Sequence, residues 1–258
     1  MAASLLNGTV KLAGLRQAVL SLATATSVTE TSVPPSDYLR VKPMTIMQSA
    51  QESIGRICEQ TDEAMLFCSL GKDSLVLLDL IYPKFKRIVC VFMYFVKGLE
   101  HIDRWIMWVK KRYPKVEFVQ VPHWNLTYVL RGGLYCVANL IIMSKMYSFI
   151  YCFLGMKKAD GMNRNLMLKG YGSSFYENGG LVYPLAEWTQ KNILSYMKQH
   201  KLPSPVRYGK NASNGVGFNL DCFLWMRQNY PNDLQKVYKV FPMSERILWE
   251  YDQKVRTE

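Results

Sequence analysis

Short, continuous apolar runs alternate along this chain with segments in which apolar residues recur every three or four positions. The continuous runs, which are typical of buried strands, cover residues 64–68, 88–96, 116–121 and 149–156. The periodic segments predict helices at 45–58, 75–80, 102–112, 134–146, 190–200 and within 220–238. Strands that alternate with helices need crossover connections. The order therefore predicts an α/β fold: a doubly wound, mostly parallel, Rossmann-like sheet with a helical C-terminal part from about residue 185.

The first 43 residues differ in composition from the rest. They are rich in Ala, Ser, Thr and Leu, contain no acidic residue before Glu30, and end in the breaker-rich stretch 33–36. Three interpretations stay open: a presequence, since Lys11 and Arg16 punctuate an apolar stretch, a flexible leader, or a start codon placed upstream of Met44. We favour the leader, and expect one folded domain over residues 44–258.

Composition and charge narrow the class of protein. With 49% hydrophobic and 20% charged residues, the chain falls in the globular range. Its longest apolar run, 89–96, stops at Lys97, far short of the roughly 20 residues that cross a bilayer, so no membrane span is expected. A net charge of +12 favours polyanionic partners such as nucleic acid, anionic lipid or phosphate-bearing metabolites.

The spacing of the six cysteines argues against a metal knuckle. Neighbouring cysteines lie at least ten residues apart, so no C-x-x-C pair is available for zinc or for dithiol chemistry. Cys68, Cys90 and Cys152 lie inside apolar stretches, as free cysteines of reducing compartments often do. We therefore expect no zinc and a cytoplasmic protein.

The segment 69–74, between the first apolar run and the next helix, has the residues of an anion-binding loop. Free backbone N–H groups and the positive end of a helix dipole converge at such a junction. Gly71 permits close backbone approach, Ser69 and Ser74 offer hydroxyl donors, and Lys72 offers an ammonium group. An anion is the natural ligand of this loop.

Asp73 adds a candidate ligand for Mg²⁺ that bridges phosphate oxygens. The loop does not match the Walker pattern, because that pattern needs a glycine where this chain has Leu66. The alternative is an ordinary polar turn in which Asp73 or Ser74 only caps the helix.

Three segments together resemble a known superfamily. The loop Ser69-Leu-Gly-Lys-Asp-Ser74 is similar to the Ser-Gly-Gly-x-Asp-Ser pyrophosphate loop of the adenine nucleotide α-hydrolases, and specifically of the phosphoadenosine phosphosulfate (PAPS) reductase family. Tyr183–Thr189, followed by a helix and Leu202-Pro203, resembles that family's Pro-Leu-Ala-x-Trp element. Residues 154–160 with Arg164 are similar to its phosphate-binding Gly-x-Arg-Arg-x-Asp/Glu stretch. The match covers roughly residues 60–205 in the expected order.

The resemblance implies an adenosine nucleotide, PAPS or ATP, whose phosphosulfate or phosphate end lies at residues 69–74. Asp73 would bind Mg²⁺ if the nucleotide is ATP. The implied nucleotide-binding residues are Ser69, Leu70, Gly71, Lys72, Asp73, Ser74, Lys157, Lys158 and Arg164. The catalytic candidates are Lys72, Asp73 and Cys222.

The departures from the family bear on mechanism. Leu70 replaces the first loop glycine, which leaves the backbone conformation there open. The reductases' Glu-Cys-Gly-x-His tail is missing, because no cysteine follows Cys222. Residues 217–222 keep only the second cysteine of a Gly-Cys-x-x-Cys element, so no iron–sulfur cluster is expected. Cys222 itself is either a lone thiol that faces the nucleotide or, as we favour, a buried helix residue.

Three functions remain open. The first is a PAPS-reductase-like oxidoreductase, and the second is an ATP pyrophosphatase that adenylates an acceptor as a transferase. The third is an inactive nucleotide-fold module that uses its basic surface to bind nucleic acid or a protein. A thiol-reductant protein, nucleic acid and a second copy of the chain stay open as partners.

Overall fold

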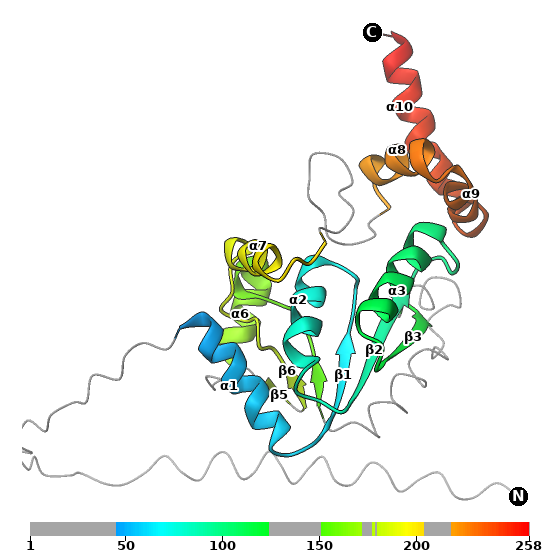
Figure 1. The fold of residues 1–258 in the computed structure, drawn as a ribbon. Helices are drawn as coiled ribbons and strands as arrows, with labels where there is room; N and C mark the ends of the chain where they lie inside the picture. The colour runs from blue at the N-terminus through cyan, green and yellow to red at the C-terminus, as the bar shows by residue number, and fades with distance from the viewer. Residues whose placement is uncertain (1–44, 124–150, 172–176, 179, 204–217, 258) are drawn as a thin grey trace, which may run out of the picture. The chain divides into compact units, whose positions relative to one another are not determined.

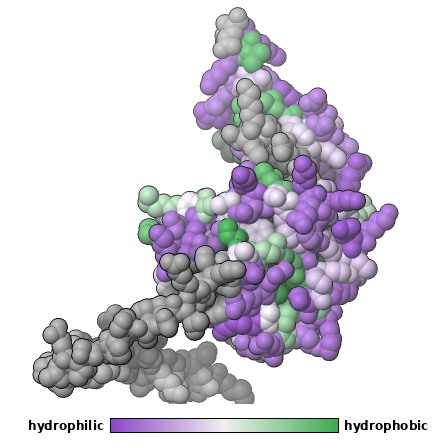
Figure 2. Space-filling model, turned by 60° about the vertical axis from the view of Figure 1, so that its left-hand side comes forward, coloured by the Kyte–Doolittle hydropathy of each residue, from purple (hydrophilic) through white to green (hydrophobic). Residues whose placement is uncertain are grey.

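The computed structural model describes residues 45–123, 151–171, 177–178, 180–203 and 218–257. The predicted leader 1–43 and the predicted helix 134–146 lie outside the described residues. Within the described part, no helix combines the length and the apolar character needed to span a bilayer. Figure 2 shows a face on which hydrophilic residues prevail and hydrophobic ones form small separate groups.

The described residues form one sheet of six strands in the order β3-β2-β1-β4-β6-β5. The strands are β1 (Glu63–Phe67), β2 (Arg87–Tyr94), β3 (Val116–Pro122), β4 (Cys152–Phe153), β5 (Glu177–Asn178) and β6 (Leu181–Val182). Every neighbouring pair is parallel except β5 with β6. The predicted α/β fold with a mostly parallel sheet is confirmed. Of the predicted strand at 149–156, residues 149–150 lie outside the described part, and within 151–156 Cys152 and Phe153 pair as β4.

The helices follow the predicted order. They are α1 (Ile46–Cys58), α2 (Lys72–Ile81), α3 (Glu100–Arg112), α6 (Met162–Gly170), α7 (Gln190–Gln199), α8 (Leu220–Asn229), α9 (Pro231–Val240) and α10 (Glu245–Thr257), with single 3-10 turns η1 (Lys158–Asp160) and η2 (Pro242–Ser244). Thr45 forms the predicted N-cap of α1, as part of a capping box with Gln48. The sequence pattern did not predict α6.

Side chains of β1 and β2 alternate between two hydrophobic clusters. Leu66 and Cys90 belong to a large cluster that also contains buried residues of α1, α2 and α3. Met65 and Val89 belong to a smaller cluster with residues of β3 and β4. Figure 1 shows α2 and α3 together on one side of β1 and β2. The loops after β1 and β4 leave this core at the carboxyl edge of the sheet.

The C-terminal helices are anchored to α3 by one buried carboxylate. Asp233 of α9 accepts hydrogen bonds from the backbone N–H groups of Glu100 (2.8 Å) and His101 (3.1 Å), at the start of α3. The His101 ring nitrogen Nδ1 lies 2.8 Å from the same carboxylate. Burial acts to raise the pKa of Asp233, but these hydrogen bonds outweigh it and the pKa is lowered. The carboxylate is therefore charged at neutral pH and caps α3 from outside the helix.

Replacing this carboxylate is expected to destabilise the fold strongly. Asp233→Ala leaves the N–H groups of α3 and the His101 ring without their buried partner, which costs about 3–5 kcal/mol of unfolding free energy. Urea denaturation followed by circular dichroism measures this loss. The control is Asp252→Ala, which breaks an exposed pair with Arg227 and costs less than about 1 kcal/mol. Equal losses in the two variants would contradict the anchor.

Candidate functional site

The loop 69–74 leaves the end of β1 and turns directly into α2. The N–H of Cys68 donates to the carbonyl of Val91 (2.9 Å), which extends the parallel ladder up to the start of the loop. Gly71 is the N-cap residue of α2 and makes no side-chain capping bond. The N-cap residue is therefore neither Asp73 nor Ser74, to which the alternative of an ordinary polar turn gave that role. The first turn of α2 presents the positive end of its dipole at the sheet edge.

Ser69 and Ser74 stabilise the loop through hydrogen bonds within it. The Ser74 hydroxyl donates to the Gly71 carbonyl (3.0 Å), and it lies 3.4 Å from the Ser69 hydroxyl. Ser69 Oγ also accepts from the N–H of Gly71 at 3.4 Å. Ser74 is buried, whereas Ser69 lines a cavity. The structure thus gives Ser74 a role inside the loop and leaves Ser69 as the serine that faces the cavity.

Leu70 has a left-handed backbone with its side chain in the core. Its φ is +61°, a region that costs a non-glycine residue about 1–2 kcal/mol. The side chain is 4% exposed and belongs to the large hydrophobic cluster. The loop therefore keeps a conformation that favours glycine, and burial of the leucine side chain offsets the strain. The Leu70 side chain thus anchors the loop to the hydrophobic core.

A chain of ion pairs joins the loop to the segment after β4. Asp73 Oδ1 lies 2.8 Å from the Lys157 ammonium, and Asp73 Oδ2 lies 3.3 Å from the Lys72 ammonium. Lys157 Nζ also lies 2.7 Å from Asp160 Oδ1, and Asp160 Oδ2 accepts from Arg164 at 2.8 Å. Burial acts to raise the pKa of Asp160, but its hydrogen bonds with Lys157 and Arg164 outweigh it and lower the pKa. Asp160 is therefore ionised at neutral pH.

Close backbone packing accompanies these ion pairs. A Cβ atom on Gly155 would lie 3.2 Å from the backbone carbonyl carbon of Asp73, which is tighter than ordinary contact. A side chain at position 155 would push the loop away. The structure thus brings together two segments, 69–74 and 154–164, that the resemblance assigned to one phosphate site.

Lys158 contacts a different part of the protein from Lys157. Its ammonium pairs with Glu187, and its N–H donates to the carbonyl of Ala186 (2.9 Å). The residue therefore ties the segment after β4 to the Pro-Leu-Ala-x-Trp segment.

Cys222 lies in the core. It follows the N-cap Asn219 in the first turn of α8 and is 0% exposed. Burial raises the pKa of its thiol to about 12, so the thiol is protonated at neutral pH. This placement matches the buried alternative and removes the basis for a nucleophile at Cys222.

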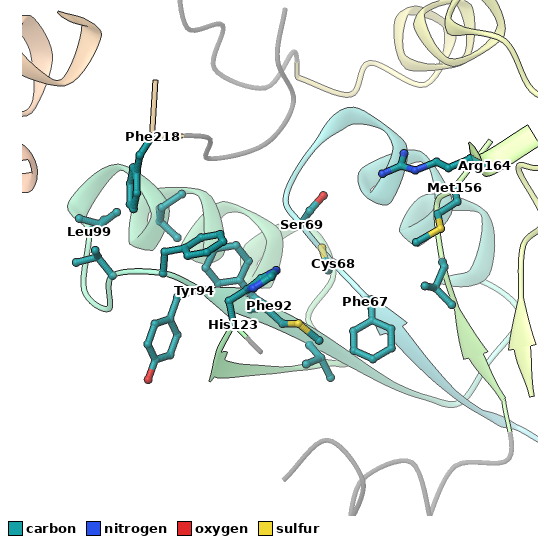
Figure 3. A pocket seen from close by; sticks show the side chains of 16 residues that line it. Phe67, Cys68, Ser69, Phe92, Tyr94, Leu99, His123, Met156, Arg164 and Phe218 are labelled. Atoms are coloured by element: carbon teal, nitrogen blue, oxygen red, sulfur yellow. The ribbon is translucent and has the colours of Figure 1, made fainter. Parts of the chain in front are cut away.

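A cavity of about 630 Å³ lies beside the loop, at the carboxyl edge of the sheet (Figure 3). Ser69 lines it from the loop, and Arg164 lines it from α6, with its guanidinium extended toward Ser69 in the view. Most of the remaining lining is apolar or aromatic and comes from β2 and from the ends of the neighbouring segments, including Phe92, Tyr94, Leu99, Met156 and Phe218.

An aromatic stack forms another part of the cavity wall. The rings of Phe95 and His123 are stacked with centroids 4.4 Å apart, and Phe218 meets Phe95 edge-on at 5.9 Å. Burial lowers the pKa of His123, so the ring is neutral at pH 7. The motifs did not predict this wall. The only available signal was the position of His123 directly after the third strand, where ligands of parallel sheets bind.

No family model matches this chain, and no curated protein does. Solved structures to which this chain is similar include an NH3-dependent NAD synthetase from Campylobacter jejuni, in complex with nitrate (TM-score 0.43, 14% identity, 80% of this chain and 95% of that one). They also include a PAPS reductase from Candida auris, in complex with phosphate (TM-score 0.40, 15% identity, 60% of this chain and 81% of that one).

The conformation of Leu70 predicts an unusual order of mutant stabilities. Leu70→Gly and Leu70→Ala both lose the buried side chain, but only glycine relieves the strain at φ +61°. Leu70→Gly should therefore be more stable than Leu70→Ala by roughly 0.5–1 kcal/mol.

Leu75 provides the matched control, because it is equally buried but lies within α2. There we expect the ordinary order, with glycine less stable than alanine by about 1 kcal/mol. Urea denaturation of the four variants measures both differences. The same order at both positions would argue against a left-handed Leu70.

Proposed function

We propose that this protein binds an adenosine nucleotide across the carboxyl ends of β1 and β2, with the phosphosulfate or phosphate end at residues 69–74. The supporting observation is one juxtaposition. The Ser69 side chain, in the loop that leads into α2, lines a cavity of about 630 Å³ with a mostly apolar wall, and Arg164 lines the same cavity. Ligand sites of this kind combine an apolar enclosure with a few polar groups at one end.

The charges around the loop suit an anionic ligand end. Three cationic side chains, Lys72, Lys157 and Arg164, lie in one ion-pair chain with only two carboxylates. One positive charge is left over, and the dipole of α2 adds to it. Arg164 is 51% exposed and lines the cavity, so its guanidinium is the group best placed to meet an incoming phosphate or sulfate.

The apolar wall suits the other end of the ligand. An adenine ring is flat and largely apolar at its faces, and it stacks on aromatic side chains. The stacked rings of Phe95 and His123 and the ring of Phe218 offer such faces. A nucleotide in this cavity would therefore lie with its base toward β2 and its anionic end toward the loop.

Lys72→Ala is expected to weaken nucleotide binding by about tenfold or more, because it removes one charge beside the anion. Isothermal titration with ATP, PAPS and adenosine 3′,5′-bisphosphate measures the affinity of each. Lys198→Ala, at an exposed position on α7, is the matched charge control and should leave the affinity unchanged. Failure of the wild-type protein to bind all three nucleotides would refute the proposed function.

Product analysis separates the two reactions that this site suits. A PAPS-reductase-like protein would release sulfite from PAPS in the presence of a thiol reductant. An ATP pyrophosphatase would release pyrophosphate from ATP. Because Cys222 is buried, we expect Cys222→Ser to leave either turnover intact once the variant is shown to be folded. A selective loss of sulfite release in this variant would restore Cys222 as a nucleophile.

The net charge of +12 supports a second candidate, a nucleic-acid-binding module without catalysis. It predicts an affinity for duplex DNA or RNA that falls steeply with salt and is retained in Lys72→Ala. Fluorescence anisotropy with labelled oligonucleotides at two salt concentrations tests this. Nucleotide affinity that depends on Lys72, without oligonucleotide binding, would favour the first proposal.

A further inference from the structure

The resemblance places Mg²⁺ at Asp73, but the contacts of Asp73 do not fit a divalent cation. Both carboxylate oxygens already face ammonium groups, Oδ1 at 2.8 Å from Lys157 and Oδ2 at 3.3 Å from Lys72. A Mg²⁺ ion binds carboxylate oxygens at about 2.0–2.1 Å and needs an open octahedral shell. A metal at that distance would stand beside two fixed positive charges.

Lys157 is fixed where it lies. Its side chain is 2% exposed, and its ammonium bridges Asp73 and Asp160 at 2.8 and 2.7 Å. Withdrawing it would leave two carboxylates facing each other in a largely buried setting, which is costly. Lys157 thus occupies the position between two carboxylates that a bridging cation would take.

The local charge balance leads to the same conclusion. Asp73 and Asp160 are matched by Lys72, Lys157 and Arg164, and one positive charge remains. A divalent cation would raise this excess to three, whereas a phosphate or sulfate group would neutralise it. The net positive charge of these five side chains therefore favours an anion and disfavours a metal ion.

We infer that the Lys157 ammonium serves as a built-in cation at Asp73, so that the loop binds the anionic end of its ligand in metal-free form. Asp73 is then a positioning residue that holds Lys157 and Lys72. This inference rests on the proposed function, and it narrows the ligand to a free phosphate or sulfate terminus rather than a Mg²⁺-chelated triphosphate. Lys157 affects the ligand indirectly, by holding the loop 69–74 in place. Its ion pair with Asp73 and the close approach of Gly155 to Asp73 fix the position of the loop.

Mn²⁺ tests the inference without any nucleotide. Electron paramagnetic resonance of added Mn²⁺ should show no specific binding to the wild-type protein. Lys157→Met keeps the length of the side chain but frees Asp73 and Asp160, and this variant should gain a Mn²⁺ site. The gained site should disappear when Asp160→Asn is added.

Lys158→Met is the matched control for this experiment. It removes the neighbouring lysine, whose partner Glu187 lies elsewhere, and should gain no Mn²⁺ site. Two results would overturn the inference: Mn²⁺ binding by the wild-type protein that is lost in Asp73→Asn, or a folded Lys157→Met variant that still binds no Mn²⁺. If Lys157→Met does not fold, the wild-type and Asp73→Asn measurements still decide.

Metal dependence of nucleotide affinity provides a second readout. We expect ATP to bind the wild-type protein in EDTA as tightly as in excess MgCl2, or more tightly, because Mg²⁺ cancels charge that the loop recognises. Affinity at least about tenfold higher with MgCl2 would overturn the inference. Absence of nucleotide binding in both buffers would instead refute the proposed function, and the Mn²⁺ result would then decide the role of Lys157 alone.

Discussion

One buried lysine holds together the two loops that form the candidate site. Lys157 follows β4, and its ammonium lies between Asp73 of the loop after β1 and Asp160 of the turn η1. A cation with almost no exposure is stable only because carboxylates face it on two sides. The ion pair with Asp73 and the close approach of Gly155 to the Asp73 backbone hold the loop 69–74 against the segment after β4.

The order of elements can be predicted from the sequence because each element carries its own local signal. Continuous apolar runs mark β1 and β2, which are buried on both faces, and the spacing of Ile102, Ile106 and Val109 marks α3. The loop 69–74 has a local signal too, in the polar residues between a buried strand and a helix. The signal of β4 is less exact, since within the described residues 151–156 of the apolar run Cys152 and Phe153 pair. The signal of α6 is weaker still, because only Leu168 of that helix is buried.

The site could be predicted only in part, because side-chain direction depends on distant partners. Lys157 and Lys158 look alike in sequence, yet one is enclosed by Asp73 and Asp160 and the other pairs with Glu187. The same limit applies to Leu70, whose left-handed backbone is offset by packing that no local pattern encodes. The resemblance named two segments, 69–74 and 154–164, that the structure places in contact. It did not identify which of the two lysines the fold turns inward.

The start of α3 belongs to two parts of the protein at once. Leu99, its N-cap residue, forms part of the cavity wall, while the next two residues are held by Asp233 of α9. Phe218, just ahead of α8, lines the same cavity. Ligand binding in the cavity and folding of α8, α9 and α10 are therefore thermodynamically linked. A bound ligand would protect these C-terminal helices against local unfolding.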